Sequence, residues 1–384
     1  MFLDKTYEKN KKLIEFAIKA HQAGEILPDS YVIDLDSLLE NARIMLAKAK
    51  EKNVTLYFML KQLGRNPYIA KKLVEMGYPG AVVVDFKEAQ VMMDNNIPIG
   101  HIGNLVQIPE AMIERVLRYG VAYISVFSLE KLKTIDRLAG KNDMVQKVIL
   151  RVYSDYDTLY PSQEAGININ ELENFLKEAK KLEHIKISGA TSFPAYLYDS
   201  DKNDIEELEN YNTIRKAIDL IQKNGYEIDH INTPSSTCTY LIDKHFNGEY
   251  LVGEPGHGLT GTTPMHAQND LVEKPCLIYL SEVSHNFKDM SYVYGGGYYR
   301  RSHVKNALVS FGDELAFDEV LPMSAESIDY YFRLKGKHKI GASVVMAFRF
   351  QIFVTRSDLV IVEDLEKEPK ITGIYDSQGR RLNE

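Results

Sequence analysis

The chain has 384 residues, of which 45% are hydrophobic and 26% are charged, the balance of an ordinary folded protein with more than one domain. Its net charge of -8 argues against nucleic acid as the main partner, and its two distant cysteines, Cys238 and Cys276, argue against a disulfide scaffold or structural zinc. Because the N-terminus is too charged for a signal peptide and no apolar run reaches the ~20 residues of a membrane span, we expect a cytoplasmic protein that binds no membrane.

The first part of the chain predicts one helix over residues 5–24, with an apolar stripe that includes Leu13, Ile14 and Ala17. Residues 31–36 then alternate as in a strand. Helical spacing follows over residues 37–53, where the preceding Asp-Ser pair is a plausible cap.

From residue 54 a regular alternation of short apolar strands and helices begins. Eight strands are predicted, at residues 54–60, 80–85, 99–105, 122–127, 147–154, 186–193, 228–236 and 250–256. Helices predicted between them include residues 67–77, 86–96, 109–120 and 169–182. Eight such units predict a (β/α)8 barrel of the TIM type.

Beyond residue 261 the pattern becomes that of strands joined by short turns. Strands are predicted at residues 275–287, 290–296, 307–311, 327–334, 342–348 and 350–355. We therefore expect an N-terminal helix and strand over 1–36 that pack with the C-terminal part, a barrel over 37–262, and a mostly β domain over 263–384.

A lysine ends the first barrel strand. Side chains at the carboxyl ends of barrel strands point into the mouth, where active sites form. A partly desolvated amine such as that of Lys61 can act as a nucleophile or a base. The alternative is a solvated lysine that merely terminates the strand.

Small and hydroxylated residues follow the seventh and eighth strands, where barrels commonly bind phosphate. These are Ser235, Ser236 and Thr237 after the seventh strand, and Gly256, Gly258 and Gly261 after the eighth. Either loop could also be an ordinary turn. Glu254, at the end of the eighth strand, predicts a protonated ligand group or an ion pair with Arg151 on the fifth strand.

The segment "YVYGGGYYRR" at residues 292–301 places glycines among tyrosines. Such a turn can present phenols as general acids or bases, or it can be an aromatic strand pair with a tight hairpin.

One cofactor could be bound by the lysine, both loops and the carboxylate together. Pyridoxal phosphate has an aldehyde for the lysine, a phosphate for the loops, and a ring nitrogen whose proton a carboxylate can hold.

These residues resemble the alanine-racemase-like class of pyridoxal-phosphate enzymes, fold type III, and most closely its YhfX-like subgroup. Residues 31–41 are similar to the opening strand and helix, "LKQLG" to the Schiff-base segment, "EPGHGLTG" to the strand-eight segment, and "YGGGYYR" to the segment that starts with the catalytic tyrosine. The resemblance implies Lys61 and Tyr294 as catalytic residues and a homodimer with shared active sites. Pyridoxal 5'-phosphate would be bound by Lys61, Arg151, Ser192, Ser235, Ser236, Thr237, Glu254, Gly256 and His257.

Several positions depart from the racemase pattern. Glu254 stands where racemases place an arginine against the pyridine nitrogen, and Ser192 stands where the family often has a histidine. Arg151 replaces a lysine, while Gln163 and Glu164 occupy the region of a substrate-facing arginine. Alanine itself is therefore not the expected substrate.

The leading prediction is an amino acid racemase or epimerase that moves the Cα proton with Lys61 and Tyr294 as the two bases. Its substrate would be a small amino acid or amine. The alternative is a lyase or decarboxylase of the same fold, which Glu254 favours. Two further classes are a non-catalytic carrier of the cofactor and a metal hydrolase built on His101, His257 or His285, although no metal site is expected. Arg349 and Arg356 are expected on a strand surface.

Overall fold

The computed structural model describes residues 2–383. Its residues group into two compact units. The barrel unit contains Met45–Leu60 and Ala70–Gly256. The sheet unit contains the chain up to Ile44, the short segment Lys61–Ile69, and the chain from His257 onward. The limits expected from the sequence, 1–36, 37–262 and 263–384, remain a prediction.

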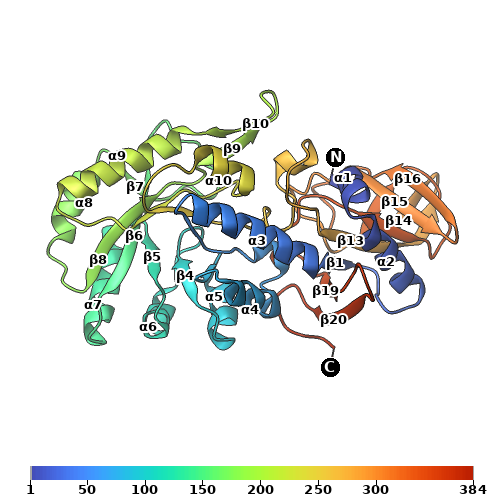
Figure 1. Ribbon diagram of the computed structural model, residues 1–384, viewed down its shortest axis with the longest axis horizontal. Helices are drawn as coiled ribbons and strands as arrows, with labels where there is room; N and C mark the ends of the chain where they lie inside the picture. Colours follow the sequence, from blue (N-terminus) through green and yellow to red (C-terminus); the bar gives the residue numbers. More distant parts are fainter. Residues whose placement is uncertain (1, 384) are drawn as a thin grey trace. The chain divides into compact units, whose positions relative to one another are not determined.

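Eight parallel strands form the barrel unit, one at each of the eight predicted positions, although β6 and β8 each begin one residue before the predicted start (Figure 1). Their order is β2-β12-β11-β8-β6-β5-β4-β3. A parallel bridge between Phe58 and Ala81 connects the two ends of this order, so the sheet closes. The bounds are β2 Thr55–Leu56, β3 Ala81–Val82, β4 Ile99–Ile102, β5 Tyr123–Val126, β6 Gln146–Tyr153, β8 Ile185–Thr191, β11 His230–Asn232 and β12 Leu251–Gly253.

A helix follows each of the first seven barrel strands. The helices are α4 Pro67–Met76, α5 Phe86–Asp94, α6 Glu110–Tyr119, α7 Leu129–Lys141, α8 Leu172–Ala179, α9 Glu209–Lys223 and α10 Thr239–His245. In α7 the buried residues Leu132, Ile135 and Ala139 recur at helical spacing, and Ser128 caps the first turn by accepting from the amide of Lys131. Smaller strands are β7 Ile167–Asn168, beside β6, and the hairpin β9 Tyr196–Asp199 and β10 Asp204–Glu207.

The sheet unit is mostly β, as predicted. Its strand order is β16-β15-β18-β13-β1-β19-β20, with β14 paired to β13 and β17 paired to β14. The bounds are β1 Ser30–Asp34, β13 Leu277–Phe287, β14 Met290–Tyr294, β15 Asn306–Phe311, β16 Glu314–Glu319, β17 Tyr331–Leu334, β18 Ser343–Met346, β19 Asp358–Glu363 and β20 Lys370–Tyr375. The strand predicted at residues 350–355 is wrong, because Ile352–Val354 forms the 3-10 turn η3.

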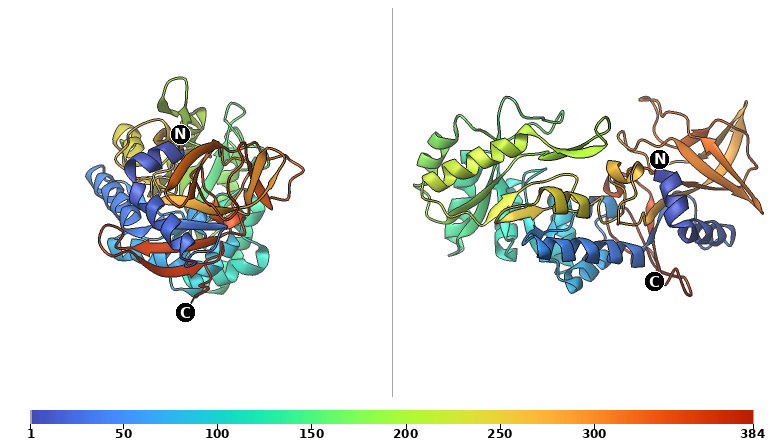
Figure 2. Two further views of the ribbon diagram at one scale, coloured as in Figure 1. Left: turned by 90° about the vertical axis from the view of Figure 1, so that its right-hand side faces the viewer. Right: turned by 45° about the horizontal axis from the view of Figure 1, so that its top comes forward.

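The N-terminal residues form two helices, α1 (Phe2–Lys9) and α2 (Lys11–Gln22), where one was predicted. The chain breaks at Asn10, whose side-chain amide donates to Asp34 Oδ2 at 2.9 Å and to the carbonyl of Pro275 at 3.0 Å. Both helices lie beside the strands of the sheet unit in the right-hand view of Figure 2, and α2 packs on β1, β13 and β18. The next helix, α3 (Leu35–Glu51), passes from the sheet unit into the barrel unit.

No helix within residues 2–383 has both the length and the apolar character that a membrane crossing requires.

Candidate active site

A buried acid–imidazole pair lies inside the barrel. Glu254 follows β12, and its Oε1 is 3.1 Å from Nδ1 of His101 on β4. The other ring nitrogen of His101 is 2.6 Å from the Ser125 hydroxyl. A neutral His101 that donates to Glu254 and accepts from Ser125 satisfies both contacts. The ion pair considered between Glu254 and Arg151 is therefore wrong, and His101 is a partner that the sequence did not indicate.

Arg151 is fully buried on β6 and bonds to carbonyl groups. Its guanidinium donates to the carbonyl of Asn104 and, at 2.8 Å, to that of Gln163, and it lies over the Phe127 ring. Burial lowers the pKa of Arg151 to about 10. Within residues 2–383, both side-chain polar atoms of Asn104 are buried and have no partner. Since orphaned buried polar atoms are uncommon, Asn104 marks a place for a polar ligand at the end of β4.

Ser192 follows β8 and belongs to a hydrogen-bond network of the neighbouring loops. Its hydroxyl accepts from Asn210 Nδ2 at 3.1 Å and donates to Asp157 Oδ2 at 3.2 Å. The proposed contact of Ser192 with a cofactor ring stays a prediction.

The loop after β11 has unusual backbone geometry. Ser235 and Ser236 have φ angles of 94° and 57°, in the left-handed region that residues other than glycine seldom occupy. The hydroxyl of the adjacent Thr237 accepts from the Glu254 amide at 3.2 Å, which connects this loop to the end of β12. Gly256, two residues beyond Glu254, is buried. Non-glycine residues in this conformation are often found at functional turns.

A second buried histidine lies further inside the barrel. The ring of His230 is 4.2 Å from that of Tyr123 and 5.6 Å from that of His101. Burial lowers the pKa of His230 well below its ordinary value, and its Nε2 has no hydrogen-bond partner within residues 2–383. Residues 99–102 and 229–232 lie on predicted strands, where successive side chains alternate between the two faces. This alternation is the sequence signal that could place His101 and His230 on the inner face.

Lys61 begins the 3-10 turn η1 (Lys61–Leu63), which belongs to the sheet unit and packs against η3. The residues after η1 contact the C-terminal tail. The Arg65 guanidinium donates to Gln378 Oε1, and a Cβ on Gly64 would lie 3.4 Å from the carbonyl oxygen of Ser377. The turn that carries Lys61 is thus fixed by residues about 300 positions later in the chain.

His257 contacts the segment that precedes η3. Its Nε2 is 3.3 Å from Arg349 Nε and 3.2 Å from Gln351 Nε2, while its Nδ1 is 3.1 Å from the Thr262 hydroxyl. Burial, followed by the charges of Arg349 and Lys61, lowers the pKa of His257 well below its ordinary value. The expectation that Arg349 lies on the surface of a strand is wrong.

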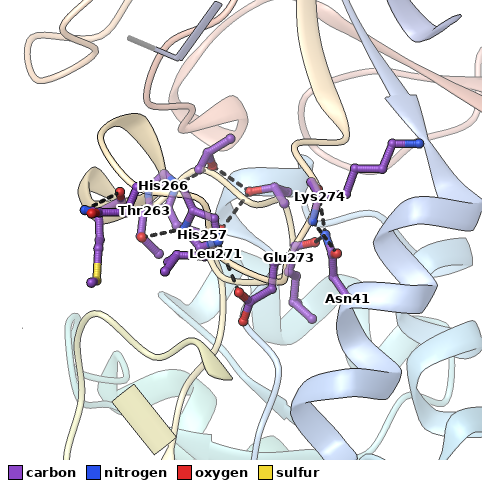
Figure 3. A network of polar contacts seen from close by, with 12 residues as sticks. Asn41, His257, Thr263, His266, Leu271, Glu273 and Lys274 are labelled. Atoms are coloured by element: carbon purple, nitrogen blue, oxygen red, sulfur yellow. Dashed lines mark hydrogen bonds and ion pairs between the residues drawn. The ribbon is translucent and has the colours of Figure 1, made fainter. Parts of the chain in front are cut away.

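The loop that follows His257 is held by a buried network (Figure 3). His266 connects the Thr263 hydroxyl, at 2.6 Å from Nδ1, with Glu273, at 3.2 Å from Nε2. Asn41 of α3 then accepts from the Lys274 amide at 2.8 Å. These contacts stabilise the loop that positions His257.

Tyr294 ends β14 with 37% of its surface exposed. Its strand pairs with β13 and β17, but the glycines that follow form no hairpin, because residues 295–300 contain no strand, so the strand pair with a tight hairpin considered for this segment is wrong. The glycines allow close packing, because a Cβ on Gly296 would lie 2.0 Å from Asp29 Oδ2, and one on Gly297 would lie 2.4 Å from the Tyr279 ring. The catalytic role of Tyr294 stays a prediction.

Within residues 2–383 no group of three or more His, Cys, Asp or Glu side chains is arranged to hold a metal ion. Both cysteines are buried thiols that form no disulfide within the described residues.

Comparison with known proteins gives consistent results for both halves of the chain. The family model of the alanine racemase N-terminal domain matches residues 33–264, and that of the YhfX-like C-terminal domain matches residues 278–371. The protein YhfX of Escherichia coli (strain K12) is 41% identical over 388 residues, covering 100% of both chains.

Two solved structures illustrate the shared fold. Alanine racemase of Clostridium difficile 630, in complex with cycloserine, has a TM-score of 0.64 at 18% identity and covers 90% of this chain and 98% of its own. Diaminopimelate decarboxylase of Helicobacter pylori, complexed with L-lysine, has a TM-score of 0.65 at 15% identity and covers 92% of this chain and 94% of its own.

Proposed function

The chain belongs to the alanine-racemase-like proteins of the YhfX group, and from this premise we propose that it is a pyridoxal-phosphate-dependent racemase or epimerase of an amino acid. The fold family consists of enzymes that use this cofactor. The observation that carries the proposal is the buried Glu254–His101 pair at the carboxyl ends of the barrel strands.

The residues at this end of the barrel fit the cofactor. Glu254 is a buried carboxylate that can hold the proton of a ring nitrogen, and Asn104 offers two orphaned polar atoms. The loop of Ser235, Ser236 and Thr237, together with the buried Gly256, would hold the phosphate. Lys61 would anchor the cofactor through its amine, and Arg151, Ser192 and His257 complete the proposed set.

When bound, the cofactor withdraws electrons from the bonds at the substrate Cα, which makes the α-proton acidic. Lys61 and Tyr294 would then each remove or return that proton, and the use of two different bases inverts the centre. Glu254 would keep the ring nitrogen protonated, while His101 orients Glu254 through their side-chain contact. Tyr294 would act in the barrel of a partner subunit within a homodimer.

The test is proton exchange in deuterated solvent. The purified protein should carry a visible chromophore, and borohydride reduction followed by mass mapping should place the label on Lys61. Deuterium should enter the α-position of at least one amino acid in a broad panel, with D/L interconversion. Lys61→Ala should lose both the chromophore and the exchange, whereas Lys71→Ala, on exposed α4 surface, should keep both. A chromophore that persists in Lys61→Ala contradicts the proposal.

A decarboxylase is the second candidate, and Glu254 is the residue that favours it. A carboxylate makes the bound ring a stronger electron sink than an arginine would, which suits the loss of carbon dioxide as well as proton exchange. Release of carbon dioxide from a substrate, with an amine as the product and no racemisation of the remaining amino acid, would replace the first proposal by this one.

A further inference from the structure

We propose that Arg349 binds the carboxylate of the substrate, so that the substrate class is amino acids that keep a free carboxyl group. The inference rests on the proposed function, because it assumes a substrate that exchanges with Lys61 on the cofactor. It assigns a role to a residue that lies outside the sequence motifs.

The first observation is that Arg349 lacks an acidic partner. Its side chain is partly buried, and within residues 2–383 its guanidinium donates from Nε to His257 Nε2 at 3.3 Å and forms no ion pair with a carboxylate. A half-buried arginine without a counter-ion is costly unless it meets an anion at some stage of function. Its terminal nitrogens stay available for the planar, bidentate contact that guanidinium groups make with carboxylates.

The second observation is that His257 orients Arg349 without neutralising it. Two donors, Arg349 Nε and Gln351 Nε2, converge on His257 Nε2, so this nitrogen must be the unprotonated one. The proton then resides on Nδ1, which contacts the Thr262 hydroxyl at 3.1 Å. A neutral imidazole therefore fixes the guanidinium in place and leaves its charge uncompensated.

The third observation is the position of this group relative to Lys61. The segment that carries Arg349 and Gln351 runs directly into η3, which packs against η1, the turn that starts with Lys61. The positive charges of Arg349, Lys61 and Arg301 each lower the pKa of His257, so all three side chains lie near this imidazole. When an amino acid takes the place of the lysine amine, its carboxylate carbon lies only two bonds from its own α-amino nitrogen. A cation beside Lys61 therefore suits this carboxylate.

The experiment compares two aminooxy probes that react with the aldehyde of the bound cofactor and displace Lys61. Aminooxyacetate carries a carboxylate, whereas O-methylhydroxylamine does not. The readout is the half-saturating probe concentration for the change in absorbance, which requires no turnover. Arg349→Gln should raise this concentration for aminooxyacetate by about 30- to 100-fold, the worth of a charged hydrogen-bond pair, and leave that for O-methylhydroxylamine unchanged. Arg349→Lys should recover part of the loss.

Arg356→Gln is the matched control, because this half-exposed arginine follows η3 and donates to the carbonyl of Asp329. It should behave as the unaltered protein with both probes. If Arg349→Gln raises the half-saturating concentration equally for both probes, the inference is overturned. A selective loss of cofactor affinity also overturns it, because it would assign Arg349 to the cofactor phosphate. Absence of any chromophore in the unaltered protein would instead overturn the proposed function.

Discussion

At the scale of single residues, Asp29 gives the clearest pH dependence. It accepts hydrogen bonds from the Tyr279 hydroxyl, at 2.9 Å, and from the Ser357 hydroxyl, beside the glycines that follow Tyr294. Burial raises the pKa of Asp29 to about 6 despite these bonds. Because the folded pKa lies above the unfolded one, the protonated form stabilises the fold below about pH 4, and this contribution is lost as the pH rises through 6.

Asp29→Asn mimics the protonated form and should remove this loss. The difference in free energy of unfolding, variant minus unaltered protein, should therefore increase from pH 4 to pH 7. The increase should be at most about 3 kcal/mol, because that is the free energy that corresponds to a shift of about two pKa units. Denaturant unfolding at a series of pH values measures it. Asp270→Asn is the control, since Lys5 lowers the pKa of this exposed carboxylate and no such rise should follow. A difference that stays constant with pH would show that Asp29 is ionised throughout.

His101 yields a second prediction at this scale. Because His101 would orient Glu254, His101→Gln should retain the chromophore but slow α-deuterium exchange by roughly 10- to 100-fold, the usual effect of losing a supporting partner. Deuterium incorporation followed by mass spectrometry measures the rate. His285→Gln, a partly buried histidine on β13 in the sheet unit, serves as the control. An unchanged rate in His101→Gln would show that the pair does not influence the site.

The sequence indicated Lys61 and Glu254 because each lies where a recognisable barrel strand stops. It could not indicate Arg349, whose contact with His257 joins residues 92 positions apart. The same limit applies to His101 and Glu254, which are 153 positions apart. Such pairs depend on how the sheets are ordered, and no local pattern reports that order.

At the scale of elements, a glycine allows two barrel strands to approach. A Cβ on Gly189 of β8 would lie 1.6 Å from the carbonyl oxygen of His230, its paired residue on β11. Gly189→Ala should therefore force these strands apart and reduce the free energy of unfolding by more than about 3 kcal/mol. Urea unfolding measures the loss. Gly225→Ala is the control, because no atom lies within 4 Å of its Cβ position and only its left-handed φ of 85° adds a cost of about 1 kcal/mol. Equal losses would contradict the steric explanation.

The eight barrel strands could be predicted because their apolar runs and intervening helices follow from local periodicity. The break at Asn10 could not, since it depends on hydrogen bonds to Asp34 and Pro275. Residues 350–355 read as a strand by composition, yet Gln351 directs its amide to His257 and the chain then turns at η3. Tertiary partners override local propensity in both places.

At the scale of the whole molecule, the proposed homodimer predicts complementation. Lys61→Ala and Tyr294→Phe homodimers should each be inactive. In a mixed dimer, one site carries both substitutions and the other pairs an intact lysine with the partner's Tyr294. After subunit exchange of equal amounts, half of the dimers are mixed and half of their sites are intact, so about a quarter of full activity should return. Activity measured before and after exchange tests this. No recovery would place both residues in the same subunit's site.

The two-part architecture could be expected from the change in pattern near residue 261. The position of β1 could not, because it lies between β13, antiparallel to it, and β19, parallel to it, and these strands come more than 240 positions later. Its alternation indicated a strand but not its neighbours.

The contacts of Gly64 and Arg65 with Ser377 and Gln378 have a consequence for biosynthesis. During translation, the lysine-bearing turn emerges from the ribosome long before the tail that holds it. A nascent polypeptide can thus complete its barrel strands while this turn still lacks its final support, and the turn matures only after Ser377 and Gln378 have been synthesised. Extensions fused to the carboxyl terminus would act on the same support.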